Sequence, residues 1–334
     1  MCRIPTSPSP MRKNDLITTR SRLLCWGIAC GLIALATLLN SGPPSAAASS
    51  VTRKVAPPGS AATDPLFWTD DRVAQALAND LSGGAPRVTL SPTGSGGTPL
   101  LRHTVVPNTL PTHAVGKLLL RSRAGLGSCS GTLIDTPSRR LVLTAAHCLF
   151  DEAGWVSSVR FLPGYEFGRS FRRWGWRFVE VAPGWIGSVL SGGLLAGKFD
   201  IGVVSLSGPL GGFIEGVDYE LRPSRFDETR ILGYPAGAMR GQQLRMCSTG
   251  TWKDTSRFSR AFPGPAPVVG QCDMAPGSSG GPWLVERVDA GGAIEYVVKG
   301  VTSVGWSRGG GRGRVLSSPF FGGALARLIR SAES

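Results

Sequence analysis

Histidine and charged side chains are scarce in this chain of 334 residues, which has three histidines and is 17% charged. Together with 46 glycines and 25 prolines, this low charge disfavours a coiled coil or an all-helical protein. The chain is nevertheless 42% hydrophobic, which excludes a disordered polymer and suffices for a sizeable core. No CxxC pair or histidine at metal-ligand spacing occurs, so zinc binding by the cysteines is the weaker alternative. These features predict a globular protein of short strands and turns.

Basic residues outnumber acidic ones by 36 to 22, giving a formal net charge of +14. This excess permits a nucleic-acid or polyanion partner without establishing one. In residues 165–185, arginines alternate with aromatic residues: Arg169, Arg172, Arg173 and Arg177 with Phe167, Phe171, Trp174, Trp176 and Phe178. Such a segment could bind a polyanion. The alternative, which we favour, is a strand hairpin whose aromatic residues are packed and whose arginines are solvated.

Only one long apolar run is present, at residues 23–39. Basic residues precede it and the small residues Ser45 to Ala48 follow it, which is the order of a signal peptide. We therefore expect residues 1–48 to be a signal peptide and the protein to be secreted, either outside the cell or to the periplasm. A retained membrane anchor is the alternative, and it is the only case in which we expect contact with a membrane.

Removal of residues 1–48 would leave four cysteines: Cys129, Cys148, Cys247 and Cys272. An even number of cysteines in an exported chain predicts two disulfides. Residues 49–110 are rich in Ala, Pro, Gly, Ser and Thr, with one predicted helix around residues 70–79, and we interpret them as a low-complexity linker or pro-segment. From residue 111 to 334, short apolar runs alternate with turn residues, which is typical of antiparallel β-barrels. A closing helix is predicted at residues 324–329.

Three segments bring together the residue types needed for nucleophilic catalysis. Their sequences are LVLTAAHC, which ends at His147 and Cys148, KFDIGVV, which contains Asp200, and CDMAPGSSGGP, which contains Ser279. A serine hydroxyl is a poor nucleophile near neutral pH, so it needs a base within hydrogen-bond reach. That base in turn needs a partner that fixes its tautomer and stabilises its cation.

The segments TAAHC and GSSGGP, with Asp200 between them, resemble the trypsin-like (chymotrypsin-like) serine proteases, in the His, Asp, Ser order of that family. GYP at residues 233–235 and CSGTLI at residues 129–134 extend the resemblance to the bacterial secreted branch that includes glutamyl endopeptidases. The resemblance covers about residues 110–330. It implies an all-β fold of two antiparallel six-stranded β-barrels with a short C-terminal helix, forming a protease domain at 111–334.

The resemblance also implies a function, namely hydrolysis of peptide bonds through an acyl-enzyme, without metal or organic cofactor. Ser279 would be the nucleophile, His147 the general base and Asp200 the group that orients His147. The backbone N–H groups of Gly277 and Ser279 would form the oxyanion hole. Cys129 would pair with Cys148, and Cys247 with Cys272. We expect protein or peptide substrates, no nucleic-acid partner and a monomer. A protease-like protein that binds without cutting is the second alternative to the enzyme.

The motifs specify the substrate preference less closely than the catalytic residues. Asp273 stands six residues before Ser279, where trypsin-like members place the carboxylate that pairs with Arg or Lys. Thr302, Ser303 and Gly305 correspond to the pocket wall and are expected to bind substrate. Glutamate preference in the resembled branch relies on a histidine at the place of Thr302, so this residue argues against it. Ser278 replaces the Asp that receives the new amino terminus in many animal members, so a zymogen would have to be activated differently.

Overall fold

The computed structural model describes residues 50–81, 104–105, 111–192, 196–210, 214–224, 228–237, 239–256, 260, 264–274, 276–289, 291–307 and 314–334. The predicted signal peptide at 1–48 lies outside these residues. Residues 46–334 form one compact unit. Within the described residues, no helix is long and apolar enough to cross a membrane.

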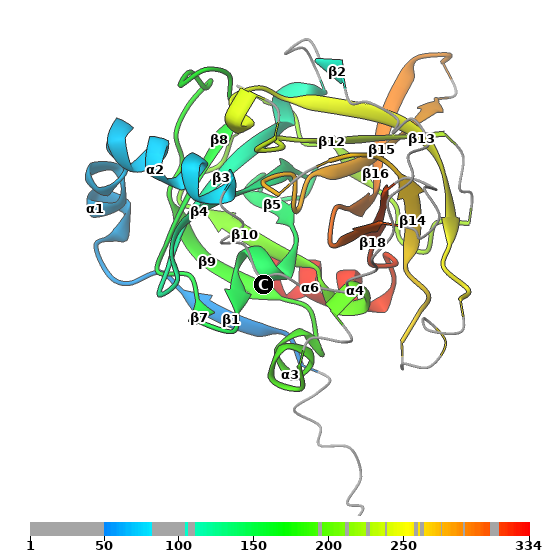
Figure 1. The fold of residues 1–334 in the computed structure, drawn as a ribbon, viewed down its shortest axis with the longest axis horizontal. Helices are drawn as coiled ribbons and strands as arrows, with labels where there is room; N and C mark the ends of the chain where they lie inside the picture. The colour runs from blue at the N-terminus through cyan, green and yellow to red at the C-terminus, as the bar shows by residue number, and fades with distance from the viewer. Residues whose placement is uncertain are drawn as a thin grey trace, which may run out of the picture. The chain divides into compact units, whose positions relative to one another are not determined.

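The described strands form two large sheets, which confirms the expected pair of barrels (Figure 1). The first sheet has the order β1 (Thr52–Val55), β9 (Trp176–Val181), β10 (Gly202–Leu206), β5 (Leu141–Thr144), β4 (Gly125–Leu133), β3 (Val115–Ser122) and β8 (Ser158–Pro163). All of its pairings are antiparallel. Six of these strands lie in the part of the chain that was expected to form the barrels. The seventh, β1, comes from the segment expected to be a linker.

The second sheet has the order β11 (Asp218–Tyr219), β16 (Ile294–Val301), β15 (Pro282–Val288), β12 (Glu228–Gly233), β13 (Arg245–Lys253), β14 (Val268–Gln271), β18 (Arg314–Ser318) and β17 (Gly305–Ser307). The short strand β2 (Thr104–Val105) pairs with β13. The described part of the sheet therefore consists of six longer strands and three short ones, β2, β11 and β17, of two or three residues each. One short strand departs from the expected antiparallel arrangement, because β11 pairs with β16 in parallel.

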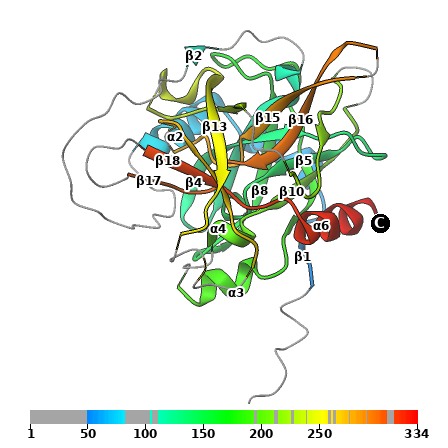
Figure 2. The ribbon, with the colours of Figure 1, turned by 90° about the vertical axis from the view of Figure 1, so that its right-hand side faces the viewer.

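The helices are few and short: α1 (Ser60–Phe67), α2 (Asp70–Leu81), α3 (Trp185–Leu190), α4 (Ala196–Phe199) and α6 (Gly323–Glu333). The predicted closing helix is α6, which contacts β9 and β10 and buries Leu325, Leu328 and Ile329 in the core (Figure 2). The predicted helix at residues 70–79 is α2. A small hairpin, β6 (Phe150–Asp151) with β7 (Gly154–Trp155), follows the segment that contains His147.

The segment at residues 50–81 is folded onto the first barrel. Strand β1 pairs along its whole length with β9. Between α1 and α2, Trp68 is 2% exposed and donates a hydrogen bond from Nε1 to the Ser158 hydroxyl on β8, at 3.0 Å. Ala76 and Leu77 of α2 are also buried. The composition of residues 49–110 had indicated a low-complexity segment with one helix, whereas this part of it contributes a strand, two helices and core side chains.

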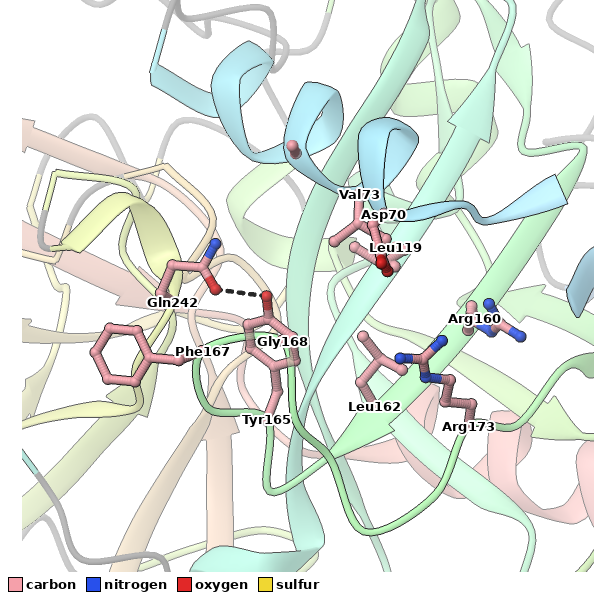
Figure 3. Close-up of a pocket in the computed structure, with 11 residues that line it drawn as sticks. Asp70, Val73, Leu119, Arg160, Leu162, Tyr165, Phe167, Gly168, Arg173 and Gln242 are labelled. Atoms are coloured by element: carbon pink, nitrogen blue, oxygen red, sulfur yellow. Dashed lines mark hydrogen bonds between the residues drawn. The ribbon is translucent and has the colours of Figure 1, made fainter. Parts of the chain in front are cut away.

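A cavity of about 400 Å³ lies between α2 and the first barrel (Figure 3). Asp70 and Val73 of α2 line it together with Leu119 of β3. Its remaining wall includes Arg160 of β8 and the neighbouring Arg173. This cavity contains none of the predicted site residues, so its size does not make it the candidate site.

The arginine-rich stretch at residues 165–185 is largely packed. Trp174, Trp176 and Phe178 are buried, whereas Phe167 and Phe171 are about half exposed. The four arginines among them, Arg169, Arg172, Arg173 and Arg177, are exposed. Three of the five aromatic rings are thus unavailable for stacking on bases. Within this stretch, all of which the structure describes, the expected strand hairpin is not formed, because β9 pairs with β1 and β10, and the stretch before it pairs with β8 only through the single bridge between Phe161 and Trp174.

Candidate active site

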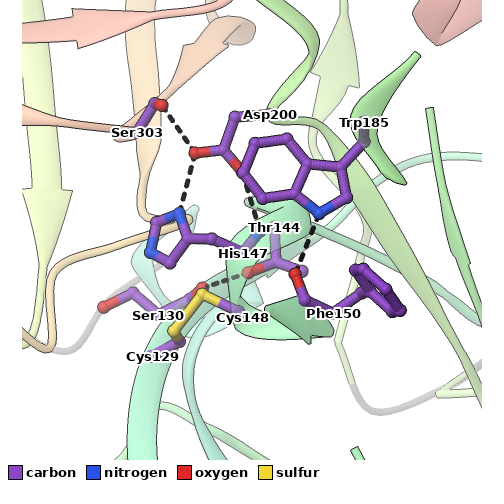
Figure 4. A network of polar contacts seen from close by, with 9 residues as sticks. All are labelled: Cys129, Ser130, Thr144, His147, Cys148, Phe150, Trp185, Asp200 and Ser303. Atoms are coloured by element: carbon purple, nitrogen blue, oxygen red, sulfur yellow. Dashed lines mark hydrogen bonds and ion pairs between the residues drawn. A yellow bond between two sulfur atoms is a disulfide. The ribbon is translucent and has the colours of Figure 1, made fainter. Parts of the chain in front are cut away.

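His147 is positioned by a buried strand and a disulfide. Strand β5 is buried along its whole length and delivers His147 into a short turn at Ala146–Cys148. Cys148 in this turn is bonded to Cys129 of β4, with 6.3 Å between the Cα atoms. At the last residue of β5, the Thr144 hydroxyl donates a hydrogen bond to the Ser130 carbonyl at 2.9 Å. The imidazole is therefore held on the first barrel by covalent and hydrogen-bonded contacts (Figure 4).

Asp200 is fully buried between α4 and β10 and accepts three hydrogen bonds. Its Oδ1 accepts from the backbone N–H of His147 at 2.8 Å, and its Oδ2 lies 2.7 Å from His147 Nδ1. The Ser303 hydroxyl donates to the same Oδ2 at 2.6 Å (Figure 4). Three donors offset the cost of burying a carboxylate, and two of them orient the histidine.

The pKa of His147 is raised above its ordinary value of 6.5. Burial by itself lowers the pKa of this imidazole, but the charge and hydrogen bond of Asp200 outweigh burial, and the charge of Asp151 adds to them. With Nδ1 directed at Asp200, Nε2 is the ring nitrogen left to exchange a proton with another group.

Ser279 shares a cavity of about 80 Å³ with His147 and Gly277. The loop that carries it is fastened to β4 through Ser130, whose backbone N–H donates to the Ser279 carbonyl at 2.7 Å. The Ser130 hydroxyl donates to the Gly277 carbonyl at 2.8 Å and accepts from the backbone N–H of Tyr234 at 3.0 Å. Ser279 is partly exposed, whereas Ser278 is 2% exposed, so Ser279 is the more accessible of the two serines.

Two glycines in this loop combine a left-handed backbone with the absence of room for a side chain. Gly277 has φ +91°, and a Cβ there would lie 2.6 Å from the Tyr234 carbonyl oxygen. Gly280 has φ +77°, and a Cβ there would lie 2.0 Å from the Thr144 hydroxyl. Both the left-handed backbone and the close packing require glycine. The backbone N–H of Gly280 donates to the Thr302 carbonyl at 2.7 Å, which links the loop to the second barrel.

The predicted substrate-binding residues do not line this cavity. Asp273 is partly buried in the loop after β14, and Gly305 is exposed at the start of β17. Thr302 is 3% exposed, and its hydroxyl accepts a hydrogen bond from Trp283 Nε1 at 3.0 Å, so its side chain is engaged inside the second barrel. The Ser303 side chain is engaged by Asp200. Sequence reasoning had placed Ser303 in a pocket wall and had not anticipated this contact.

Two residues of α2 also line the cavity that contains Ser279, and sequence reasoning missed them. Asp80 is 5% exposed and accepts hydrogen bonds from the Ser128 backbone N–H at 3.0 Å and from the Ser128 hydroxyl. Asn79 donates from its amide to the Leu126 carbonyl at 2.7 Å. The only signal for these two residues in the sequence was the helix predicted around residues 70–79.

Both expected disulfides are present. Cys129–Cys148 supports His147, and Cys247–Cys272 joins β13 to the loop that leads to Asp273. Among the described residues, one group of side chains is close enough to suggest a metal site, and it consists of Cys129, His147 and Cys148. Because both sulfurs are used in the disulfide, this group offers a metal one free ligand at most.

Comparison with known proteins places these observations in a family. Residues 112–319 match the family model described as Trypsin. A search of curated protein sequences finds no match.

Solved structures share the fold. The protease Anisep from Arthrobacter nicotinovorans has a TM-score of 0.53 and 22% identity, covering 67% of this chain and 97% of its own. The thermostable serine protease AL20 from an extremophilic microorganism has a TM-score of 0.53 and 23% identity, covering 68% and 100%. A Glu endopeptidase in complex with MPD has a TM-score of 0.52 and 19% identity, covering 70% and 96%.

Proposed function

The chain belongs to the trypsin family of serine endopeptidases, and we propose that it cleaves peptide bonds with Ser279, His147 and Asp200 as its catalytic triad. The observation that carries this proposal is the 2.7 Å contact between His147 Nδ1 and Asp200, together with the cavity that His147 shares with Ser279. One ring nitrogen is occupied by the orienting carboxylate, and the other is available to the serine hydroxyl.

The proposed reaction follows the scheme defined in this family. Ser279 Oγ attacks the carbonyl carbon and transfers its proton to His147 Nε2, while the carbonyl oxygen becomes an oxyanion. The backbone N–H groups of Gly277 and Ser279 stabilise this oxyanion. The C–N bond then breaks, the leaving amine takes the proton from His147, and an acyl-enzyme remains on Ser279. Water, deprotonated by His147, hydrolyses the acyl-enzyme and restores the serine.

Hydrolysis of a peptide substrate by three single variants tests these roles. Ser279→Ala and His147→Ala are expected to reduce kcat by about 10⁴-fold or more, because each removes a group that acts in the transition state. Ser278→Ala is the matched control, since Ser278 is the buried neighbour in the same loop. Retained activity in Ser279→Ala, or its loss in a folded Ser278→Ala, would contradict the assignment of the nucleophile.

Asp273 is the residue to test for preference before the scissile bond. Its spacing of six residues from Ser279 supports a preference for Arg or Lys. A peptide panel that varies this residue, cleaved by wild type and by Asp273→Ser, is expected to show loss of cleavage after Arg and Lys in the variant. Unchanged cleavage after Arg and Lys in Asp273→Ser would show that Asp273 does not determine this preference.

We also propose that the enzyme is exported through residues 1–48 and acts as a monomer on protein or peptide substrates, without a nucleic-acid partner. The basic-apolar-small order of residues 1–48 supports export, as does the presence of two disulfides. All groups of the proposed site come from one chain, so a single copy suffices. N-terminal sequencing of the exported protein tests cleavage after Ala48, and its size in solution tests the monomer.

A further inference from the structure

The end of α2 reaches the same cavity as the proposed nucleophile. Asn79 and Asp80 line it together with His147 and Ser279. Their hydrogen bonds to Leu126 and Ser128 attach α2 to β4, directly before Cys129 of the disulfide. Because β1 and Trp68 anchor the same segment in the first barrel, the segment at residues 50–81 is built into the wall of the cavity.

The lining indicates on which side of Ser279 this cavity lies. It includes His147, which returns a proton to the leaving amine in the proposed reaction, and the Cys129–Cys148 disulfide beside it. It does not include Asp273 or Gly305, which the family resemblance assigns to the pocket for the residue before the scissile bond. The cavity therefore lies on the side that receives the leaving half of the peptide.

The charge of this cavity is opposite to that of the chain. Among the described residues, its lining contains two carboxylates, Asp80 and Asp151, and neither lysine nor arginine, although the chain has 36 basic residues. Asp151 is partly exposed at the β6–β7 hairpin, and its charge acts on His147. Lys117 is fully buried near Asp80 and offsets part of the negative charge of Asp80. Of the lining residues that the structure describes, Asp151 is thus the main charge offered to a substrate.

We propose that α2 and the β6–β7 hairpin together form the subsite for the leaving half of the peptide, and that this subsite selects Lys or Arg over Asp or Glu. Asp151 attracts the basic side chain, and Asp80 is a positioning residue that holds β4 and α2 as the opposite wall. This inference rests on the proposed function. It assigns residues 50–81 to the working enzyme instead of to a segment that must be removed.

The test uses peptides with a constant acyl half and a leaving half that begins with Lys, Ala or Glu, and an aryl ester with the same acyl half. Wild type is expected to have kcat/KM about fivefold higher for the Lys peptide than for the Glu peptide, as for a partly exposed charge pair. Asp151→Asn is expected to bring this ratio close to one. Asp80→Asn is expected to lower the ratio by less and to raise KM for the peptides. Glu152→Gln, at the exposed neighbouring carboxylate, is the matched control and should keep the ratio.

The outcomes separate this inference from the proposed function. Ester hydrolysis without discrimination between the Lys and Glu peptides overturns the subsite and leaves the function intact. The same holds if Glu152→Gln lowers the ratio as much as Asp151→Asn does. Absence of hydrolysis of the ester and of every peptide overturns the proposed function, and the subsite with it.

Discussion

The buried cation Lys117 provides a sharp test of how α2 is attached to the catalytic domain. Its side chain is fully buried on β3, and Nζ donates to the Gly241 carbonyl at 3.0 Å. The rings of Tyr165 and Tyr234 lie 5.9 Å and 5.5 Å from the same nitrogen. Asp80 of α2 supplies the opposing charge. The attraction between these two buried charges, without a direct ion-pair contact, thus acts between β3 and the helix that lines the proposed active site.

Removing either charge alone is expected to be costly, because the other one stays buried. Lys117→Met and Asp80→Asn should each lower the free energy of unfolding by about 1–3 kcal/mol, the usual cost of leaving a buried polar group without its partner. The double variant should be more stable than the sum of the two losses implies, with a coupling energy of about 1–3 kcal/mol. Urea unfolding of the four proteins, followed by tryptophan fluorescence, measures these quantities.

The same lysine predicts a dependence of stability on pH. Burial lowers the pKa of Lys117 to about 8, from 10.5. Between these two pH values the unfolded chain binds more protons than the folded one, so the contribution of Lys117 to stability rises with pH across this window. Lys117→Met should lack this rise. Additive losses in the double variant, or an unchanged pH profile in Lys117→Met, would refute the idea of a coupled buried pair.

Three further predictions follow from the packing of the site. Gly280→Ala would place a Cβ 2.0 Å from the Thr144 hydroxyl, so displacement of the nucleophile loop should lower kcat/KM by about 100-fold in a steady-state assay. Because Asp200 raises the pKa of His147 and the neutral imidazole is the active form, activity should fall as pH drops through a value above 6.5. Asp200→Asn should shift this acid limb to lower pH in a pH–rate profile. Trp68→Ala should lower the free energy of unfolding of the whole domain by about 3–5 kcal/mol, whereas a separate low-complexity linker would give no change.

The chemistry-bearing motifs were predictable because each is local. A buried strand that ends at His147, and a glycine-rich loop around Ser279, have residue types that few other structures require at those spacings. The cysteine pairs followed from the family resemblance, and the structure contains both. The recurrence of short apolar runs between turn residues predicted antiparallel β-barrels, and their number followed from the family resemblance.

Strands with polar inward residues were not predictable from apolar runs. In β13 the inward positions include Thr249 and Thr251, which are 7% and 8% exposed. A search for hydrophobic stretches passes over such a strand, although its side chains alternate with the period of two expected for a strand. Burial of threonine in a paired strand is a property of the assembled sheet.

Long-range hydrogen bonds also could not be predicted from the sequence. Ser303 meets Asp200 across 103 positions of the chain, and Ser128 meets Asp80 across 48. Nothing in the local sequence around a serine distinguishes a pocket wall from the partner of a buried carboxylate. The contribution of α2 was missed for the same reason, since composition alone does not reveal which barrel a helix will pack against.

The central claim is that Ser279 is a nucleophile activated by His147, and covalent labelling tests it most directly. An active-site serine phosphonate, followed by peptide mapping by mass spectrometry, should place one phosphonyl group on Ser279 in the wild-type protein. Labelling should disappear in Ser279→Ala with the fold intact by circular dichroism. A folded wild-type protein that is not labelled, or a label found on another serine, would contradict the account.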